Sequence, residues 1–235
     1  MNHNALYIDL LKRVLLDQIH NDDAKRIDGR DWPIQGFTMV GKRRLDNIQL
    51  CVEQVLEHKI PGDFLEAGVW RGGSAMFMRA LLKAANCTNR NVWLADSFQG
   101  LPPPKPDWAA DAGDTLHEYE ELAVSLEKVK ANFDALELLD EQVRFIPGWF
   151  HETLYTAPVQ SLAILRLDGD MYESTYVSLE ALYDKVSPGG FVIVDDYGFL
   201  DSCKQAVHDF LNTRNLAPKI ITVDWTGVYW HKEQA

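Results

Sequence analysis

The chain has 235 residues, of which 46% are hydrophobic and 25% are charged, and its mean hydropathy is -0.22. These values are typical of a soluble globular protein and exclude a disordered chain, a collagen-like chain and a disulfide-rich scaffold. The 23 Lys and Arg residues against 35 Asp and Glu residues give a net charge of -12, which disfavours nucleic acid and anionic membrane surfaces as partners.

The three cysteines, Cys51, Cys87 and Cys203, are widely spaced and form no CxxC pair. This spacing argues against a disulfide framework and a zinc-thiolate site. The sequence also lacks a run of ~18 apolar residues, as a membrane span requires, and its N-terminus lacks the regions of a signal peptide. We therefore expect a cytoplasmic protein.

The N-terminal part predicts two helices separated by a long loop. Residues 6–19 place apolar side chains at helical spacing, which indicates an amphipathic helix, and a second helix is predicted over 45–58. The intervening segment 21–41 is polar and contains Gly and Pro. Long loops of this kind are often lids or binding segments, although a simple connector fits the pattern equally well.

From residue 63 onward, short apolar runs alternate with helical stretches. The predicted strands are DFLEAG, NVWLAD, VRFIPG, LAILRLDGD and GFVIVDD, and the predicted helices span 73–85, 119–138 and 172–186. This alternation favours an α/β fold with a mainly parallel, doubly wound sheet. The tail KIITVDWTGVYWHK predicts an antiparallel hairpin. The Pro-rich segment 101–119 interrupts the alternation and is either an insertion that faces substrate or a surface loop.

The first strand ends in a glycine-rich turn, which contains Gly68, Gly72 and Gly73. Glycine lets the backbone approach a ligand closely, and the first strand-to-helix turn of a parallel sheet is where nucleotide-type ligands lie. The spacing G-x-x-x-G-G differs from the dinucleotide fingerprint G-x-G-x-x-G. Alone, the turn is also consistent with a tight connection that binds nothing.

Two carboxylates flank this turn, and they bear on the choice of ligand. Glu66 precedes the turn, and Asp96 ends the next strand, where a carboxylate can accept both hydroxyls of a ribose. Two acids disfavour a polyphosphate but suit a cationic sulfonium, so the pattern favours S-adenosylmethionine over NAD or ATP. Trp149 and Phe150 follow the third strand and either flank the adenine or pack in the core.

Four further acids follow two other strands: Asp168 and Asp170 after one, Asp195 and Asp196 after the next. If those strands are parallel neighbours, the carboxylates converge, and they cannot all ionise cheaply unless a cation lies among them. Oxygen ligands without His or Cys favour Mg²⁺. A metal ion beside a methyl donor indicates methyl transfer to a hydroxyl, with Asp170 as the candidate base and the other three as metal ligands. The role of Arg166 is left open, as an ion-pair partner or an outward-facing residue.

The chain resembles the macrocin O-methyltransferase family through ordered blocks along nearly its whole length. These blocks are LYIDLLKRVL, TMVGKRRLDNIQ, FLEAGVWRGGSAMFMR, LADSFQGLPPP, PGWFHETL, LRLDGDMYEST, PGGFVIVDDY and GVYWHK. The resemblance implies a Rossmann-like class I methyltransferase fold and an enzyme that depends on Mg²⁺ and S-adenosylmethionine. Such an enzyme would methylate sugar hydroxyls of natural products such as macrolide and aminocoumarin antibiotics. A polysaccharide precursor is a further possible acceptor. It also implies a single domain over residues 1–235, with N-terminal helices and lid in 1–60 and the core in 61–235, and a homo-oligomer, either a dimer or a tetramer.

Carried over by position, the family motifs assign roles to individual residues. Asp168, Asp195 and Asp196 would be metal ligands and Asp170 the general base. The residues implied around the cofactor are Thr38, Met39, Glu66, Gly68, Ser74, Asp96 and Ser97. Trp149 is a further candidate from its place after the third strand. The partner would be a hydroxylated, sugar-bearing small molecule.

Three alternatives remain at this point. Catechol-type methyltransferases share the fold and an acidic metal site, but they typically use a Lys after the first ligand, whereas this chain reads DGDMYEST there. A metal-dependent glycosyltransferase would use Asp168-Gly169-Asp170 as a DxD motif, although the glycine-rich turn before Asp96 argues against it. A non-catalytic binding module would retain the fold without a reason to keep four acids.

Overall fold

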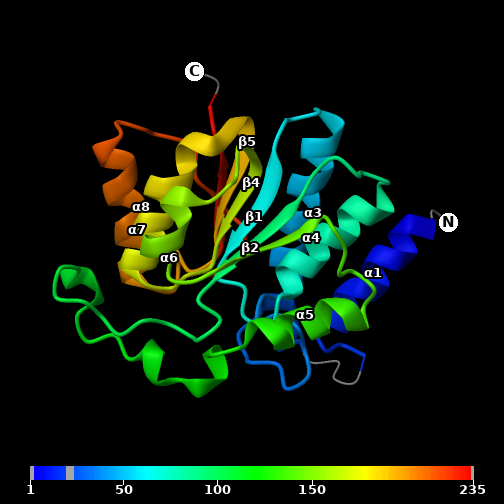
Figure 1. Ribbon diagram of the computed structural model, residues 1–235, viewed down its shortest axis with the longest axis horizontal. Helices are drawn as coiled ribbons and strands as arrows, with labels where there is room; N and C mark the ends of the chain where they lie inside the picture. The colour runs from blue at the N-terminus through cyan, green and yellow to red at the C-terminus, as the bar shows by residue number, and fades with distance from the viewer. Residues whose placement is uncertain (1–2, 20–23, 234–235) are drawn as a thin grey trace.

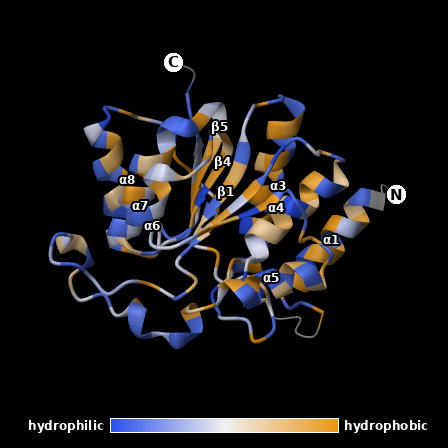
Figure 2. Ribbon diagram, viewed as in Figure 1, coloured by the Kyte–Doolittle hydropathy of each residue, from blue (hydrophilic) through white to orange (hydrophobic). Residues whose placement is uncertain are grey.

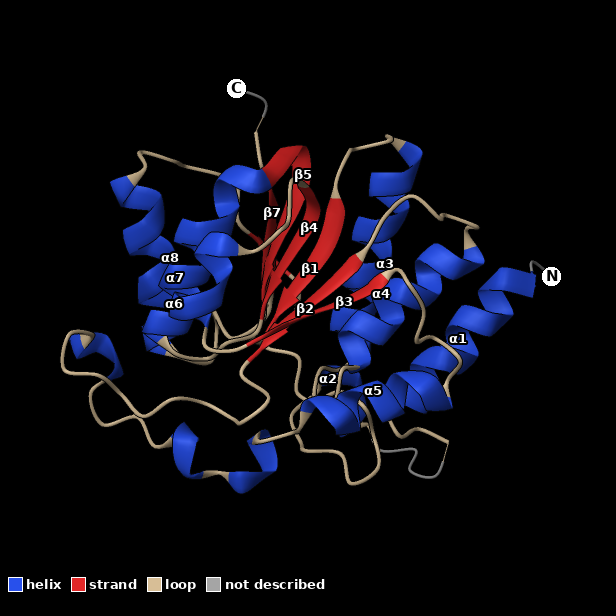
Figure 3. Ribbon diagram, in the orientation of Figure 1, coloured by secondary structure: helices blue, strands red, loops and turns tan. Residues whose placement is uncertain are grey.

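The computed structural model describes residues 3–19 and 24–233. A seven-stranded sheet in the order β3-β2-β1-β4-β5-β7-β6 runs through the centre of the protein (Figure 3). Neighbouring strands from β3 to β5 are parallel, whereas β7 is antiparallel to β5 and to β6. The strands are Asp63–Ala67 (β1), Val92–Asp96 (β2), Val143–Pro147 (β3), Leu162–Leu167 (β4), Val186–Val194 (β5), Ile221–Thr222 (β6) and Val228–His231 (β7). The predicted doubly wound sheet with an antiparallel hairpin at its end is confirmed.

Helices cover both faces of the sheet (Figure 1). Successive strand residues point to opposite faces, so Phe64 packs in one hydrophobic cluster with α1, α3, α4 and α5, while Leu65 packs in a second cluster with α7 and α8. The helices are His3–Leu15 (α1), Lys25–Asp28 (α2), Lys42–Glu57 (α3), Gly73–Ala84 (α4), Leu126–Ala135 (α5), Phe150–Thr153 (α6), Tyr172–Leu182 (α7) and Asp201–Thr213 (α8). Figure 2 shows the apolar residues concentrated in the strands between these layers.

Helices α5 and α8 differ from the sequence prediction, and the short helices α2 and α6 lie outside the predicted ones. The helix predicted over 119–138 begins only at Leu126, because the Ser125 hydroxyl accepts a hydrogen bond from the backbone N–H of Lys128 and so caps its first turn. Residues 120–122 form a separate 3₁₀ turn. Helix α8 was not among the predicted helices.

The segment 24–41, predicted as a long loop, is organised around one buried cation. Arg26 is 2% exposed and donates hydrogen bonds to the backbone carbonyls of Leu16, Asp31, Thr38 and Val40. These bonds satisfy carbonyls that an irregular segment would otherwise bury without partners. The segment therefore packs as part of the fold, and it contains the short helix α2; residues 21–23 of the predicted loop lie outside the described residues.

The segment 101–122 is also attached to the body of the protein. The Asp111 carboxylate accepts hydrogen bonds from the first two backbone N–H groups of α7, those of Tyr172 and Glu173, at 2.7 and 2.9 Å. Lys105 donates to Glu173 at 2.6 Å, and the ring of Trp108 lies against Tyr172 with 5.5 Å between centroids. This segment therefore has a defined position beside the helix that follows Asp170.

Across residues 3–19 and 24–233, none of the helices has both the length and the apolar character needed to cross a membrane. The single-domain division at residue 60 and the cytoplasmic location stay predictions.

Candidate active site

A cavity of about 450 Å³ opens at the carboxyl ends of β1, β2, β4 and β5, within the size range of small-molecule sites. This edge of an open α/β sheet is where ligands generally bind. The predicted site residues in the cavity lining are Met39, Gly68, Asp96, Ser97, Trp149, Asp168, Asp170, Asp195 and Asp196. Phe150 lines the cavity as well, so both aromatic residues of the PGWF block face it.

The turn after β1 brings two strand ends into direct contact. Gly68 has a φ of +86°, and a Cβ added there would lie 1.8 Å from the backbone oxygen of Asp168. Only glycine fits this position, because a side chain would clash with backbone that cannot rotate away. The end of β1, which leads into the glycine-rich turn, is thereby held against the end of β4, which is followed by Asp168 and Asp170.

Asp96 has both carboxylate oxygens engaged by backbone groups. Oδ2 accepts a hydrogen bond from the N–H of Val69 at 2.8 Å, and Oδ1 accepts one from the N–H of Phe98 at 2.7 Å. Burial raises the pKa of Asp96, and these hydrogen bonds oppose the rise. The carboxylate is therefore fixed in orientation at the edge of the cavity, and its remaining lone pairs can accept ligand hydroxyls.

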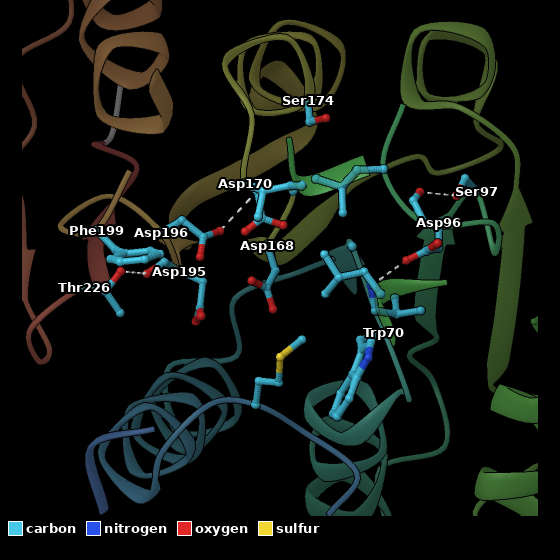
Figure 4. A pocket seen from close by; sticks show the side chains of 18 of the residues that line it. Trp70, Asp96, Ser97, Asp168, Asp170, Ser174, Asp195, Asp196, Phe199 and Thr226 are labelled. Carbon is cyan, nitrogen blue, oxygen red and sulfur yellow. Dashed lines mark hydrogen bonds between the residues drawn. The ribbon is translucent and has the colours of Figure 1, made fainter. Parts of the chain in front are cut away.

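The four predicted acids meet at the ends of β4 and β5, which are parallel neighbours (Figure 4). One ligand oxygen each from Asp168, Asp195 and Asp196 lies within 4.8 Å of the others. Asp170 adopts a left-handed backbone conformation with a φ of +60°, and its N–H donates to Asp196 Oδ2 at 3.3 Å. Such a conformation is unusual for a residue with a side chain and clusters at functional sites. The close approach of these oxygens suits a hard divalent cation.

Burial and mutual repulsion both raise the pKa values of the clustered aspartates. Burial, followed by the charges of neighbouring aspartates, raises the pKa of Asp170 and Asp196 well above the ordinary value for aspartate. The same causes raise the pKa of Asp168, although Arg166 opposes the rise. A cation among these groups would relieve the repulsion.

Two arginines compensate part of this negative charge. Arg166 is fully buried and donates to Glu66 Oε1 at 2.5 Å, to Asp168 Oδ2 at 2.8 Å and to Asp195 Oδ1 at 2.5 Å. Arg44 on α3 binds the other oxygen of Asp195. Of the two roles considered for Arg166, the structure shows the ion-pair partner, since its guanidinium lies at the centre of the acid cluster. Its position also orients two of the predicted metal ligands.

Three predicted cofactor residues lie behind the cavity lining. Glu66 is 1% exposed, and burial raises its pKa to about 8; its Oε2 has no hydrogen-bond partner among the described residues. Thr38 and Ser74 are buried and share a hydrogen bond of 3.3 Å between their hydroxyl oxygens. In this structure these side chains support the site from behind, and direct contact with a cofactor stays a prediction for them.

Several lining residues were not singled out from the sequence. Arg44 is separated from Asp195 by 151 positions, so no local pattern indicates their pairing. Phe199 and Trp225 lie beyond the acidic block and in the terminal hairpin. Their aromatic character was visible in the sequence, but only the fold places them at the same opening as the acids.

The fold is that of the class I O-methyltransferases. The solved structure of the O-methyltransferase NovP superposes with a TM-score of 0.95 at 48% identity, covering 98% of this chain and all of the other.

Residues 12–232 match the macrocin-O-methyltransferase (TylF) family, and the chain belongs to that family. An 8-demethyl-8-(2,3-dimethoxy-alpha-L-rhamnosyl)-tetracenomycin-C 4'-O-methyltransferase from Streptomyces olivaceus is 51% identical, over 98% of this chain and 94% of that protein. A demethyldecarbamoylnovobiocin O-methyltransferase from Streptomyces niveus is 47% identical, over 97% of this chain and 94% of that protein. The resemblance found in the sequence is thus confirmed.

Proposed function

We propose that this protein transfers the methyl group of S-adenosylmethionine to a sugar hydroxyl of a glycosylated natural product and uses Mg²⁺. The observation that carries the proposal is the meeting, in one cavity, of the glycine-rich turn and Asp96 with an aspartate cluster on adjacent strands. The names of the relatives from both Streptomyces species support a glycosylated acceptor, since one names a rhamnosyl tetracenomycin and the other names demethyldecarbamoylnovobiocin.

The cofactor would lie over the ends of β1 and β2. Asp96 would accept the ribose hydroxyls there, while Trp149 and Phe150, which line the same cavity, would flank the adenine. The lining near Asp168 is negatively charged, which favours a sulfonium over a phosphate. This arrangement would direct the methyl group toward the acid cluster.

The donor set of Asp168, Asp195 and Asp196 fits Mg²⁺, because all three offer carboxylate oxygens and the cluster is short of positive charge. When bound, the ion lowers the pKa of an acceptor hydroxyl. Asp170 would take the proton from that hydroxyl: it lies outside the set of three, and burial among carboxylates makes it a stronger base than an exposed aspartate. Asp168 and Asp195 are held by Arg166, which fixes their orientation.

The lining also bears on the alternative acceptors. The part of the cavity wall formed by described residues contains no lysine, so the base that catechol-type enzymes typically use is missing from it. The grouping of Asp168 with Asp195 and Asp196, instead of with Asp170, also differs from what a DxD motif would give. Both observations favour an aliphatic sugar hydroxyl and a methyl donor.

The test combines binding with product analysis. S-adenosylmethionine is titrated calorimetrically into the protein with Mg²⁺ and with a chelator, and UDP-glucose serves as the control ligand. Methyl transfer to demethyldecarbamoylnovobiocin and to the rhamnosyl tetracenomycin is followed by the mass shift of the product. We expect cofactor binding under both conditions and methyl transfer only with the metal. Binding of UDP-glucose without binding of S-adenosylmethionine would contradict the proposal.

A further inference from the structure

An exposed aromatic ring lies at the mouth of the cavity, next to the acid cluster. Phe199 is 62% exposed and stands three residues after Asp196. Its ring contacts Trp225 edge to face, with 5.3 Å between centroids and 73° between planes. Both residues line the cavity, and Figure 4 shows Phe199 beside Asp195 and Asp196. Two adjacent aromatic rings that line one cavity, one of them largely exposed, are suited to contact an apolar group of a ligand.

The turn that carries Phe199 is held rigidly against the terminal hairpin. The N–H of Gly198 donates to the carbonyl oxygen of Thr226 at 2.8 Å, and the N–H of Leu200 donates to that of Asp196 at 2.9 Å. A Cβ on Gly198 would lie 2.5 Å from the oxygen of Trp225, so a glycine is needed for this close approach. Trp225 is fixed from its other end, since its Nε1 donates to the carbonyl oxygen of Asp28 at 2.7 Å. The two rings are therefore preorganised, and binding on them would cost little ordering entropy.

The charges around the rings restrict what can bind there. Among described lining residues, carboxylates outnumber cations. Arg44 is paired with Asp195 and Asp224, and the guanidinium of Arg30 lies 4.5 Å from the ring centroid of Trp225. A nucleoside diphosphate on Phe199 would bring negative charge beside Asp195 and Asp196. A neutral apolar group faces no such repulsion and gains from covering Phe199.

We propose that Phe199 and Trp225 form the subsite for the apolar group that is joined to the acceptor sugar. The inference rests on the proposed function, because it assigns the part of the acceptor that lies beyond the reacting sugar. Phe199 supplies the open ring, and Trp225, backed by Arg30, supports it. The subsite therefore selects a sugar that already carries an apolar aglycone over the same sugar linked to a nucleotide.

A pair of probes with one sugar and two aglycones tests the subsite directly. The affinities of 4-nitrophenyl α-L-rhamnoside and methyl α-L-rhamnoside are measured calorimetrically with the protein loaded with S-adenosylhomocysteine and Mg²⁺. We expect the aryl glycoside to bind about 2- to 12-fold more tightly, as aromatic contacts contribute in other proteins. Phe199→Ala should remove this preference, Phe199→Tyr should retain it, and both should bind S-adenosylhomocysteine like the wild type.

Tyr155→Ala provides the matched control, because Tyr155 is 50% exposed but lies outside the cavity lining. It should leave the preference for the aryl glycoside unchanged. Equal affinities of the two rhamnosides for the wild type, including no measurable binding of either, would overturn the inference. Tighter binding of dTDP-rhamnose than of the aryl glycoside would also overturn it. So would a Phe199→Ala protein that keeps the preference for the aryl glycoside but changes its oligomeric state in light scattering. Failure of S-adenosylhomocysteine to bind at all would instead refute the proposed function.

Discussion

Replacing Arg166 by methionine tests whether the acid cluster is held together by one buried cation. Arg166 is fully buried and lies 2.5 to 2.8 Å from oxygens of Glu66, Asp168 and Asp195. Methionine keeps the apolar stem but removes every hydrogen-bond donor, so the carboxyl groups of Glu66, Asp168 and Asp195 lose their shared partner. Removing one member of a buried ion pair costs ~3–5 kcal/mol, because the charge that stays behind is uncompensated.

The expected loss can be measured as a shift in thermal unfolding. For a chain of this size, ~1 kcal/mol changes the Tm by ~2–4 °C, so Arg166→Met should lower the Tm by ~6–20 °C in a chelator. The control is Arg214→Met, which breaks a pair with Asp184 of 2.8 Å whose side chains are 39% and 69% exposed. Exposed pairs contribute ~0–1 kcal/mol, so this variant should shift the Tm by no more than ~4 °C. Equal shifts in the two variants would refute the view that Arg166 compensates the cluster.

Three further changes probe the site. Asp170→Asn should retain metal and cofactor binding in calorimetry but lose ~10²- to 10⁴-fold in turnover, and an active variant would assign the proton to another group. Gly68→Ala should weaken Mn²⁺ binding and lower the free energy of unfolding in urea. Gly113→Ala is the control, because Gly113 has a similar positive φ but no heavy atom within 4 Å of an added Cβ, and it should cause smaller losses. Equal losses in the two variants would contradict this. Burial raises the pKa of Glu66 from 4.5 to about 8. Between these two pH values the folded state holds a proton on Glu66 that the unfolded state has lost, so the free energy of unfolding falls as the pH rises. The stability of Glu66→Gln relative to the wild type should therefore increase across that window in urea titrations, whereas a constant difference would contradict the raised pKa.

The arrangement of the acids could be predicted in part, because the place of each acid at a strand end is a local feature of the sequence. Asp168 and Asp195 each follow an apolar strand directly, and carboxyl ends of neighbouring parallel strands meet at one edge of a sheet. The sequence could not show that β4 and β5 are neighbours, but the run of alternating strands and helices made it the simplest arrangement.

The compensating charges could not be predicted in the same way. Arg44 reaches Asp195 from a helix that precedes the whole sheet, and Arg26 organises a segment whose polar, Gly-containing sequence is typical of a loop. Their roles depend on tertiary packing that leaves no periodic signal. Helix α8 is a different case, since Cys203, Val207 and Phe210 stand at helical spacing and are buried, so the sequence does carry a periodic signal for this helix.

The attachment of Asp111 to the first turn of α7 limits how this enzyme can be redesigned. Segment 101–122, part of which lines the cavity, and the helix that begins two residues after Asp170 share hydrogen bonds, so they form one mechanical unit. A chimera that grafts this segment from another family member must bring an equivalent carboxylate with it. Without one, a change intended for selectivity would also loosen the backbone next to Asp170, the proposed base.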